Sequence, residues 1–262
     1  MRLTHWLVTS VSVAVTLTLT TAASASNAPP NTPSAVAAPA TALVGPLFSA
    51  GLARQHTCTA SVLDSPGHDL ILTAAHCVSG NGTGILFAPG YDRGATPYGV
   101  WTSVAAYVDP SWISDQDPQH DVAILRLARR QVPGGSVGVA DVTRVAEAIA
   151  PAPRPGEQLS VPSYPAGIED QPISCNVSAY YFGKYPSFNC AGYVGGTSGA
   201  PWLARIGHSW VVTGVIGGLH QGGCVDYTSY SSAFGLDTYR LWLRAAFHQP
   251  ADTVPVAGPD GC

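Results

Sequence analysis

Three short segments of this chain contain a histidine, an aspartate and a serine, in that order along the sequence. The segments read LTAAHC, HDVAIL and GGTSGAP, and they contain His76, Asp121 and Ser198. A serine hydroxyl is a weak nucleophile at neutral pH, so it needs an imidazole to accept its proton and a carboxylate to orient that imidazole. The segments therefore predict a fold that brings these three side chains together.

The order of the three residues narrows the choice of fold. Subtilisins place aspartate first and α/β-hydrolases place serine first, whereas histidine, aspartate, serine is the order of chymotrypsin-like enzymes. On these motifs the chain resembles the trypsin-like, chymotrypsin-fold serine peptidases of the bacterial secreted type, over roughly Val44 to Phe247. One position departs from the family pattern, because Thr197 stands where relatives usually carry an aspartate before the serine.

Asp117 is the nearest competitor for the role of Asp121. It lies in the turn-like run DQDP, whereas Asp121 directly precedes an apolar strand. Asp121 is therefore the favoured orienting residue.

The body of the chain predicts an all-β fold. Short apolar runs alternate with Gly, Pro, Asn and Asp, as in β-barrels and β-sandwiches, and no central stretch has a convincing helical period. The resemblance implies two six-stranded antiparallel β-barrels followed by a C-terminal α-helix. The expected strands are 57–63, 70–73, 99–108, 122–127, 158–162, 174–182, 201–205, 210–217 and 231–235.

A proline-rich segment at 151–155 marks the expected boundary between the barrels, because proline interrupts helices and strands. The N-terminal barrel then covers 44–150 and the C-terminal barrel with its helix covers 151–249, so that the catalytic cleft lies between them. Residues 250–262 form a turn-like tail.

The end of the second barrel has a helical period, with Asp237 as the expected N-cap. By resemblance, this helix docks on the second barrel. Its apolar stripe consists of Tyr239, Trp242, Leu243, Ala246 and Phe247.

The N-terminus has the pattern of an export signal. An apolar run over 7–19 follows a short polar start, and Ala23–Ala25 is a small-x-small cleavage site. Residues 1–25 are expected to be removed, which would leave a secreted protein without a membrane anchor, since the run is shorter than the roughly 20 residues of a membrane span. The Ala- and Pro-rich stretch 26–43 is interpreted as a flexible leader or pro-segment.

Composition argues against nucleic acid as a partner. The 12 Lys and Arg against 16 Asp and Glu give a net charge of −4, and no basic patch alternates with aromatic residues. Six cysteines without a C-x-x-C pair indicate disulfides rather than a metal site. We therefore expect neither a nucleic-acid partner nor a metal. The resemblance implies a peptide or protein substrate and no cofactor, and we expect a monomer.

The resemblance also assigns groups around the serine. The amides of Gly196 and Ser198 are expected to bind the oxyanion, and the missing side chain of Gly196 lets substrate approach its backbone. The segment Gly217–Gly218–Leu219 occupies the place of the edge strand that pairs with the substrate main chain.

The pocket for the residue before the scissile bond is expected to be uncharged. Relatives that select charged residues carry a counter-charge at the position of Gly192 or of Ile216. Val194, close to Gly192, is uncharged as well. His220 is interpreted as a solvated loop residue, with contact at the pocket mouth as the alternative. Asp226 is a further acid that could approach from the side.

The cysteine pairing is only partly specified by the sequence. By resemblance, Cys58 pairs with Cys77. The other four allow three connectivities; Cys175–Cys190 with Cys224–Cys262 is favoured because it closes a short loop, and Cys190–Cys224 is the main rival.

These observations predict a secreted serine endopeptidase that acts through an acyl-enzyme. Two alternatives remain open on the sequence. One is a catalytically silent secreted binding protein on the same fold, and the other is a serine esterase that uses the same triad.

Overall fold

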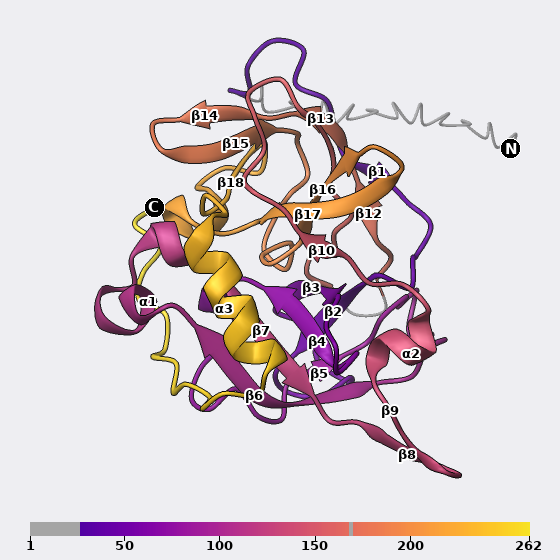
Figure 1. The fold of residues 1–262 in the computed structure, drawn as a ribbon. Coiled ribbons are helices and arrows are strands. Elements are labelled where there is room, and N and C mark those ends of the chain that lie inside the picture. Colours follow the sequence, from indigo (N-terminus) through magenta and orange to yellow (C-terminus); the bar gives the residue numbers. More distant parts are fainter. Residues whose placement is uncertain (1–26, 168–169) are drawn as a thin grey trace, which may run out of the picture.

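The computed structural model describes residues 27–167 and 170–262. The expected signal peptide at 1–25 lies outside the described residues. Two β-rich halves lie one above the other, and a helix near the C-terminus crosses the front of the lower one (Figure 1). Within the described parts of the chain, no helix is long and apolar enough to cross a membrane.

Six antiparallel strands close the N-terminal half into a barrel, in the order β2-β3-β4-β7-β6-β5. All residues of β2, β3 and β4 are buried, because both the barrel interior and the covering loops exclude water. The strands are β2 (Val44–Phe48), β3 (Cys58–Leu63), β4 (Leu70–Thr73), β5 (Leu86–Phe87), β6 (Trp101–Val108) and β7 (Ala123–Leu127).

The C-terminal half is not a second closed barrel, and this part of the prediction is wrong. It forms a five-stranded sheet, β10-β17-β16-β11-β13, and a three-stranded sheet, β14-β15-β18. The strands are β10 (Ala148–Ile149), β11 (Gln158–Ser160), β13 (Asn176–Ser178), β14 (Tyr180–Phe182), β15 (Tyr185–Asn189), β16 (Pro201–Ile206), β17 (Ser209–Val215) and β18 (Thr228–Tyr230).

The reason for the open arrangement lies between β13 and β14. The amide of Ala179 donates to the carbonyl of Glu157 at 2.9 Å, which continues the pairing of β13 with β11 by one residue, and the chain changes partner after it. β13 pairs with β11, and β14 pairs with β15. β10 runs parallel to β17, so the C-terminal sheet begins just before the proline-rich segment 151–155.

Most predicted strands are present, with ends displaced by at most two residues. The strand expected at 231–235 is wrong, because the strand here is β18, which ends at Tyr230. The long strand expected at 174–182 is divided into β13, β14 and part of β12 (Ile173–Ser174). The remaining hairpin joins β8 (Arg130–Val132) to β9 (Gly135–Val137).

Two short helices occur in the middle of the chain, where none was expected. They are α1 (Pro110–Asp115) and α2 (Val139–Thr143). Helices of five or six residues make fewer than two turns, so they show no apolar period in the sequence. Three 3₁₀ turns, η1 (Ala75–Cys77), η2 (Pro118–His120) and η3 (Leu219–Gly222), lie close to the site described below.

The C-terminal helix α3 (Leu236–Ala246) is present, but it buries a different face from the one predicted. Its buried residues are Thr238, Leu241, Ala245 and Ala246, whereas Tyr239 is 49% exposed and Phe247 is 64% exposed. Gly235, not Asp237, holds the N-cap position. The helix contacts β6 and β7 of the N-terminal barrel rather than the second half, which corrects the expected docking.

The Ala- and Pro-rich leader is partly ordered. β1 (Val36–Ala37) pairs antiparallel with β12, and Ser34 forms a bridge to Ala191. These contacts are made by backbone groups, which every sequence has, so they do not require apolar periodicity. The expectation of a flexible stretch does not hold from about Ser34 to Ala37.

Candidate active site

His76 lies in η1, directly after β4 of the closed barrel. The next residue, Cys77, forms a disulfide with Cys58 at the start of β3, so the histidine turn is tied to the barrel on two sides. The His76 side chain is 8% exposed. Its ring therefore has little freedom and faces the cleft between the halves.

Asp121 is fully buried at the C-terminal end of η2 and accepts three hydrogen bonds. Oδ2 lies 2.8 Å from Nδ1 of His76 and accepts from the Gly218 amide at 2.9 Å, and Oδ1 accepts from the His76 amide at 2.9 Å. An ionised carboxylate in this position requires the proton on Nδ1 and leaves the Nε2 lone pair free.

Asp117 does not reach His76. Its side chain caps η2 by accepting from the Gln119 amide at 3.0 Å, and it lies 3.2 Å from His120. The structure therefore brings Asp121, and not its competitor, to the histidine.

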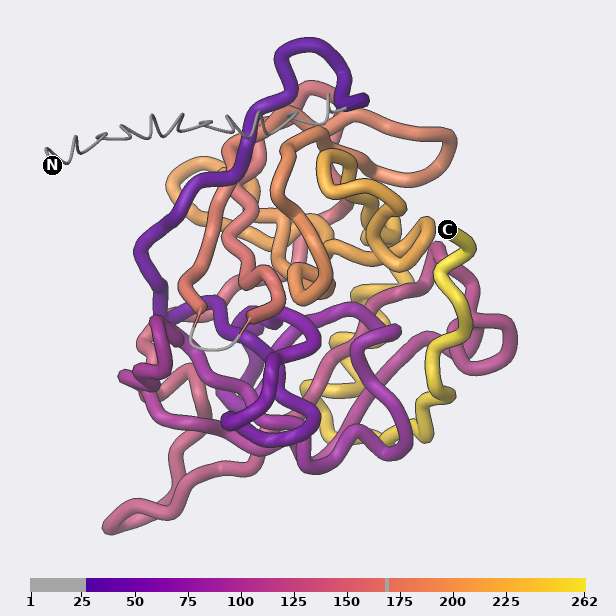
Figure 2. Tube along the Cα trace, turned by 180° about the vertical axis from the view of Figure 1, so that it is seen from behind, coloured from indigo at the N-terminus to yellow at the C-terminus, as the bar shows by residue number. Residues whose placement is uncertain are grey.

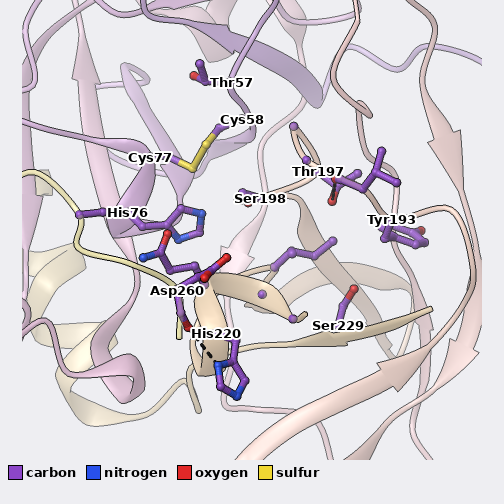
Figure 3. Close-up of a pocket in the computed structure, with 18 of the residues that line it drawn as sticks. Thr57, Cys58, His76, Cys77, Tyr193, Thr197, Ser198, His220, Ser229 and Asp260 are labelled. Atoms are coloured by element: carbon purple, nitrogen blue, oxygen red, sulfur yellow. Dashed lines mark hydrogen bonds between the residues drawn. A yellow bond between two sulfur atoms is a disulfide. The ribbon is translucent and has the colours of Figure 1, made fainter. Parts of the chain in front are cut away.

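Ser198 reaches the same cleft from the C-terminal half (Figure 3). Its carbonyl accepts from the Thr59 amide of β3 at 2.7 Å, which joins the serine loop to the N-terminal barrel. Between the described His76 ring and the Ser198 hydroxyl there is no hydrogen bond. Such contacts are often long without substrate and shorten when it binds.

The loop before Ser198 leaves two backbone donors free. In the part of the chain that the structure describes, the amides of Gly196 and Ser198 have no protein acceptor. Gly196 has φ +91° and a Cβ there would lie 2.4 Å from the Ala166 amide nitrogen, so only glycine fits. Two free amides, one on the serine itself and one two residues before it, can bind an oxyanion.

Thr197 is almost fully buried and holds this loop from within. Its hydroxyl donates to the Val194 carbonyl at 2.7 Å, and its amide donates to the same carbonyl at 3.2 Å. The position that in relatives carries a charged carboxylate is thus held by a local, neutral hydrogen bond.

The cleft between the halves has a volume of about 620 Å³ and contains both His76 and Ser198. Of the residues assigned to substrate binding by resemblance, Val194 lines it, but Gly192, Gly217, Gly218 and Leu219 do not. At Gly217, Gly218 and Leu219 the chain turns, with φ +75° at Gly218, and enters η3 instead of continuing as an edge strand.

Other residues take over the lining. Tyr193, Ile216 and Ser229 line the cleft beside the serine loop, and His220 and Asp226 also line it. Burial raises the pKa of Tyr193, so its phenol stays protonated and donates to the Val161 carbonyl at 2.5 Å. Sequence reasoning missed Ser229, since it is in register with Phe188 of β15 and no local motif marks it.

A family model described as a trypsin-like peptidase domain matches residues 58–215, which is more than half of the chain and contains all three residues described above. This chain belongs to the trypsin-like peptidase family. No curated protein matches its sequence.

Solved structures of this trypsin-like peptidase's fold agree with that assignment. The chain is similar to the protease Anisep from Arthrobacter nicotinovorans, with a TM-score of 0.67 and 23% identity over 80% of this chain and 98% of that chain. It is similar to a thermostable serine protease, AL20, from an extremophilic microorganism, with a TM-score of 0.66 and 24% identity over 79% and 98%. Human heparin binding protein has a TM-score of 0.60 and 15% identity over 87% and 99%.

Three disulfides brace this trypsin-like peptidase. They join Cys58 to Cys77, Cys175 to Cys190, and Cys224 to Cys262, and the pairing is the one favoured from the sequence. Two groups of possible metal ligands in the described residues include His76 or His220, but the cysteines in both are disulfide-bonded and so are not thiolate ligands.

Thr59 is a further residue that sequence reasoning missed. Its hydroxyl donates to the Gly196 carbonyl at 3.0 Å and accepts from the Tyr164 amide at 3.1 Å. It therefore connects the serine loop to the segment that packs behind it. Because the partners lie more than 100 positions away, no local pattern could have identified this role.

Behind the same loop lies a buried histidine. The Nε2 atom of His56 is 2.6 Å from Oδ2 of Asp170 and 3.0 Å from the Pro165 carbonyl, and its side chain is fully buried. The adjacent Ala166 amide donates to the Gly195 carbonyl at 2.7 Å. The pair of His56 and Asp170 therefore holds in place the segment that contacts the loop before Ser198.

Proposed function

We propose that this trypsin-like peptidase is a secreted serine endopeptidase that hydrolyses peptide bonds through an acyl-enzyme intermediate. The observation that carries the proposal is the bonding of Asp121, which is fully buried and accepts from both the Nδ1 atom and the amide of His76. This arrangement favours the tautomer whose Nε2 atom can accept the proton of Ser198.

In the first half of the reaction, Ser198 Oγ forms a bond to the scissile carbonyl carbon while its proton moves to His76 Nε2. The amides of Gly196 and Ser198 stabilise the negative charge on the carbonyl oxygen. His76 then donates the proton to the leaving amine as the C–N bond breaks, which leaves an ester on Ser198.

In the second half, a water molecule attacks the ester and His76 accepts the water proton. The ester C–O bond breaks, Ser198 recovers its proton from His76, and the product carboxylic acid leaves. No step needs a metal or an organic cofactor, and the charge on Asp121 stabilises the imidazolium in both halves.

The compartment and the partner follow from the same proposal. Three disulfides support an oxidising environment outside the cell. The substrate is a peptide or protein, the working species is a monomer, and residues 26–43 act as the leader or pro-segment.

Active-site labelling tests the proposal. A fluorophosphonate probe should label the wild-type protein and should not label Ser198→Ala or His76→Ala, with circular dichroism showing that all three are folded. Labelling of Ser198→Ala, or no labelling of folded wild type, would contradict it.

Two observations favour a silent binding protein as the alternative. The His76 ring and the Ser198 hydroxyl are not hydrogen-bonded, and one protein of similar fold is named for heparin binding. Folded protein that binds peptide but takes no probe would support this alternative. For labelled protein, turnover of casein against turnover of short acyl esters separates the peptidase from an esterase.

A further inference from the structure

The C-terminal tail crosses from the N-terminal barrel to the loops of the C-terminal half, which Figure 2 shows in yellow. Its first part is fastened to the barrel side. Val254 and Gly80 exchange backbone hydrogen bonds of 2.7 and 2.8 Å. Gln116 then donates to the Val256 carbonyl at 2.9 Å and accepts from the Gly258 amide at 2.7 Å.

The last part of the tail is fastened to the segment around η3. Gln221 donates to the Gly258 carbonyl at 2.7 Å, and Nδ1 of His220 lies 3.0 Å from the Asp260 carbonyl. The disulfide from Cys224 to Cys262 closes the end. The tail is therefore held on both sides of the cleft by backbone and covalent contacts, and it forms a wall there.

This wall reaches the catalytic centre. Val256, Ala257 and Asp260 line the same cleft as His76 and Ser198. In Figure 3, Asp260 lies below His76, on the side of His220 and away from the bridge between Cys58 and Cys77. The wall thus lies next to His220 and Gln221, which follow Gly217–Leu219 in the chain and line the cleft.

The charge of the cleft has one sign. Its lining residues include two carboxylates, Asp226 and Asp260, and no lysine, arginine or glutamate. Asp260 is exposed to solvent in the cleft, and its Oδ1 accepts only a hydrogen bond from the Cys262 amide, at 3.0 Å. A carboxylate in a concave site attracts a cation and repels an anion.

We propose that the C-terminal tail is a specificity wall and that Asp260 selects a lysine or arginine side chain two to four residues before the scissile bond. The inference rests on the proposed function for the direction of the substrate. The resemblance puts the substrate main chain before the scissile bond beside Gly217–Leu219. In this structure the residues that follow, His220 and Gln221, line the cleft and hold the tail. In this proposal the residue next to the scissile bond lies at Tyr193, Ile216 and Ser229, which line the same cleft and carry no charge.

Peptides that differ at one position test the proposal. Each carries leucine or alanine before the scissile bond and either lysine or glutamate at one of the three preceding positions. At low salt, wild type should show a kcat/KM for lysine about three- to tenfold above that for glutamate at one of these positions at least, and 0.5 M NaCl should reduce the ratio.

The Asp260→Asn protein should lose this preference to within about twofold. Asparagine can still accept from the Cys262 amide, so the tail keeps its course. Asp64→Asn is the matched control, because it removes the same charge from an exposed residue outside the cleft lining, and it should keep the wild-type ratio. No preference in wild type, a preference kept in Asp260→Asn, or one lost only in Asp226→Asn would overturn the proposal.

A binding measurement separates this proposal from the proposed function. Fluorescence anisotropy with the same peptides and Ser198→Ala protein reports recognition without turnover. A lysine preference that Asp260→Asn abolishes in this background supports the wall even if the wild type takes no fluorophosphonate label. Labelled, active protein that binds lysine and glutamate peptides equally overturns the wall and leaves the peptidase assignment intact.

Discussion

The Thr197 hydroxyl donates a 2.7 Å hydrogen bond to the Val194 carbonyl, three residues earlier in the loop that presents the Gly196 and Ser198 amides. Thr197→Val removes this bond from a buried site. We expect the free energy of unfolding to fall by about 1 kcal/mol and kcat to fall about tenfold, because the amides lose their fixed position. Thr197→Ser keeps the hydroxyl and should stay within about twofold of wild type. Equal kcat in the two variants would show that the bond does not order the loop.

A second prediction concerns the N-terminus. Relatives with an aspartate before the serine can pair it with a newly cut ammonium terminus, and breaking such a buried pair costs about 3–5 kcal/mol. Thr197 cannot form that pair, so proteins beginning at different residues between Asn27 and Pro33 should have equal turnover per titrated active site. Deletion beyond Ala38 should lower Tm because the pairing of β1 with β12 is lost. Activity from one defined terminus only would contradict this prediction.

Substitution of the buried carboxylate should separate the two candidate aspartates. Asp121→Asn keeps the shape but favours the wrong imidazole tautomer, and we expect kcat to fall by about 10⁴. Asp117→Asn should leave kcat within about threefold, since Asp117 caps η2 instead of contacting His76. Steady-state kinetics on one peptide substrate tests both, and a large loss in Asp117→Asn alone would reverse the assignment.

Stability should depend on pH through Glu147, which is remote from the cleft lining. Burial raises the pKa of Glu147 from 4.5 to about 7, and its Oε2 atom has no hydrogen-bond partner. The folded state disfavours the ionised form, so this contribution to stability is present below pH 4.5 and is lost as the pH rises to about 7, by at most about 3 kcal/mol.

Glu147→Gln removes this titration. The difference in Tm between the variant and wild type should therefore increase in favour of the variant between pH 4.5 and 7 and stay constant above that range. Thermal unfolding followed by circular dichroism at several pH values measures it. A difference that does not change with pH would mean that Glu147 ionises in the folded protein as it does in the unfolded chain.

Cleavage profiling should show an uncharged residue next to the scissile bond. Tyr193, Ile216 and Ser229 line that part of the cleft and offer no counter-charge. Mass spectrometry of products from a mixed peptide library reports the preference. Strict cleavage after lysine or arginine would instead implicate Asp226, and Asp226→Asn should then abolish it.

The sequence by itself identified the candidate triad residues, because their signals are local. The short segments around His76, Asp121 and Ser198 combine turn residues with the ends of strands, and most strands of the closed barrel can be located from their apolar runs. The resemblance supplied the pair Cys58–Cys77, and for the other four cysteines a short loop favoured the pairs that the structure contains.

Tertiary structure decided how these pieces close on one another. The C-terminal half stays open because β13 pairs with β11 whereas β14 pairs with β15. The helix α3 packs on the first barrel through Leu241 and Ala245 rather than through its more apolar Tyr239 face. Thr59 and Asp260 enter the site from segments far away in the chain. Such contacts depend on register and packing between distant segments, which local composition does not specify.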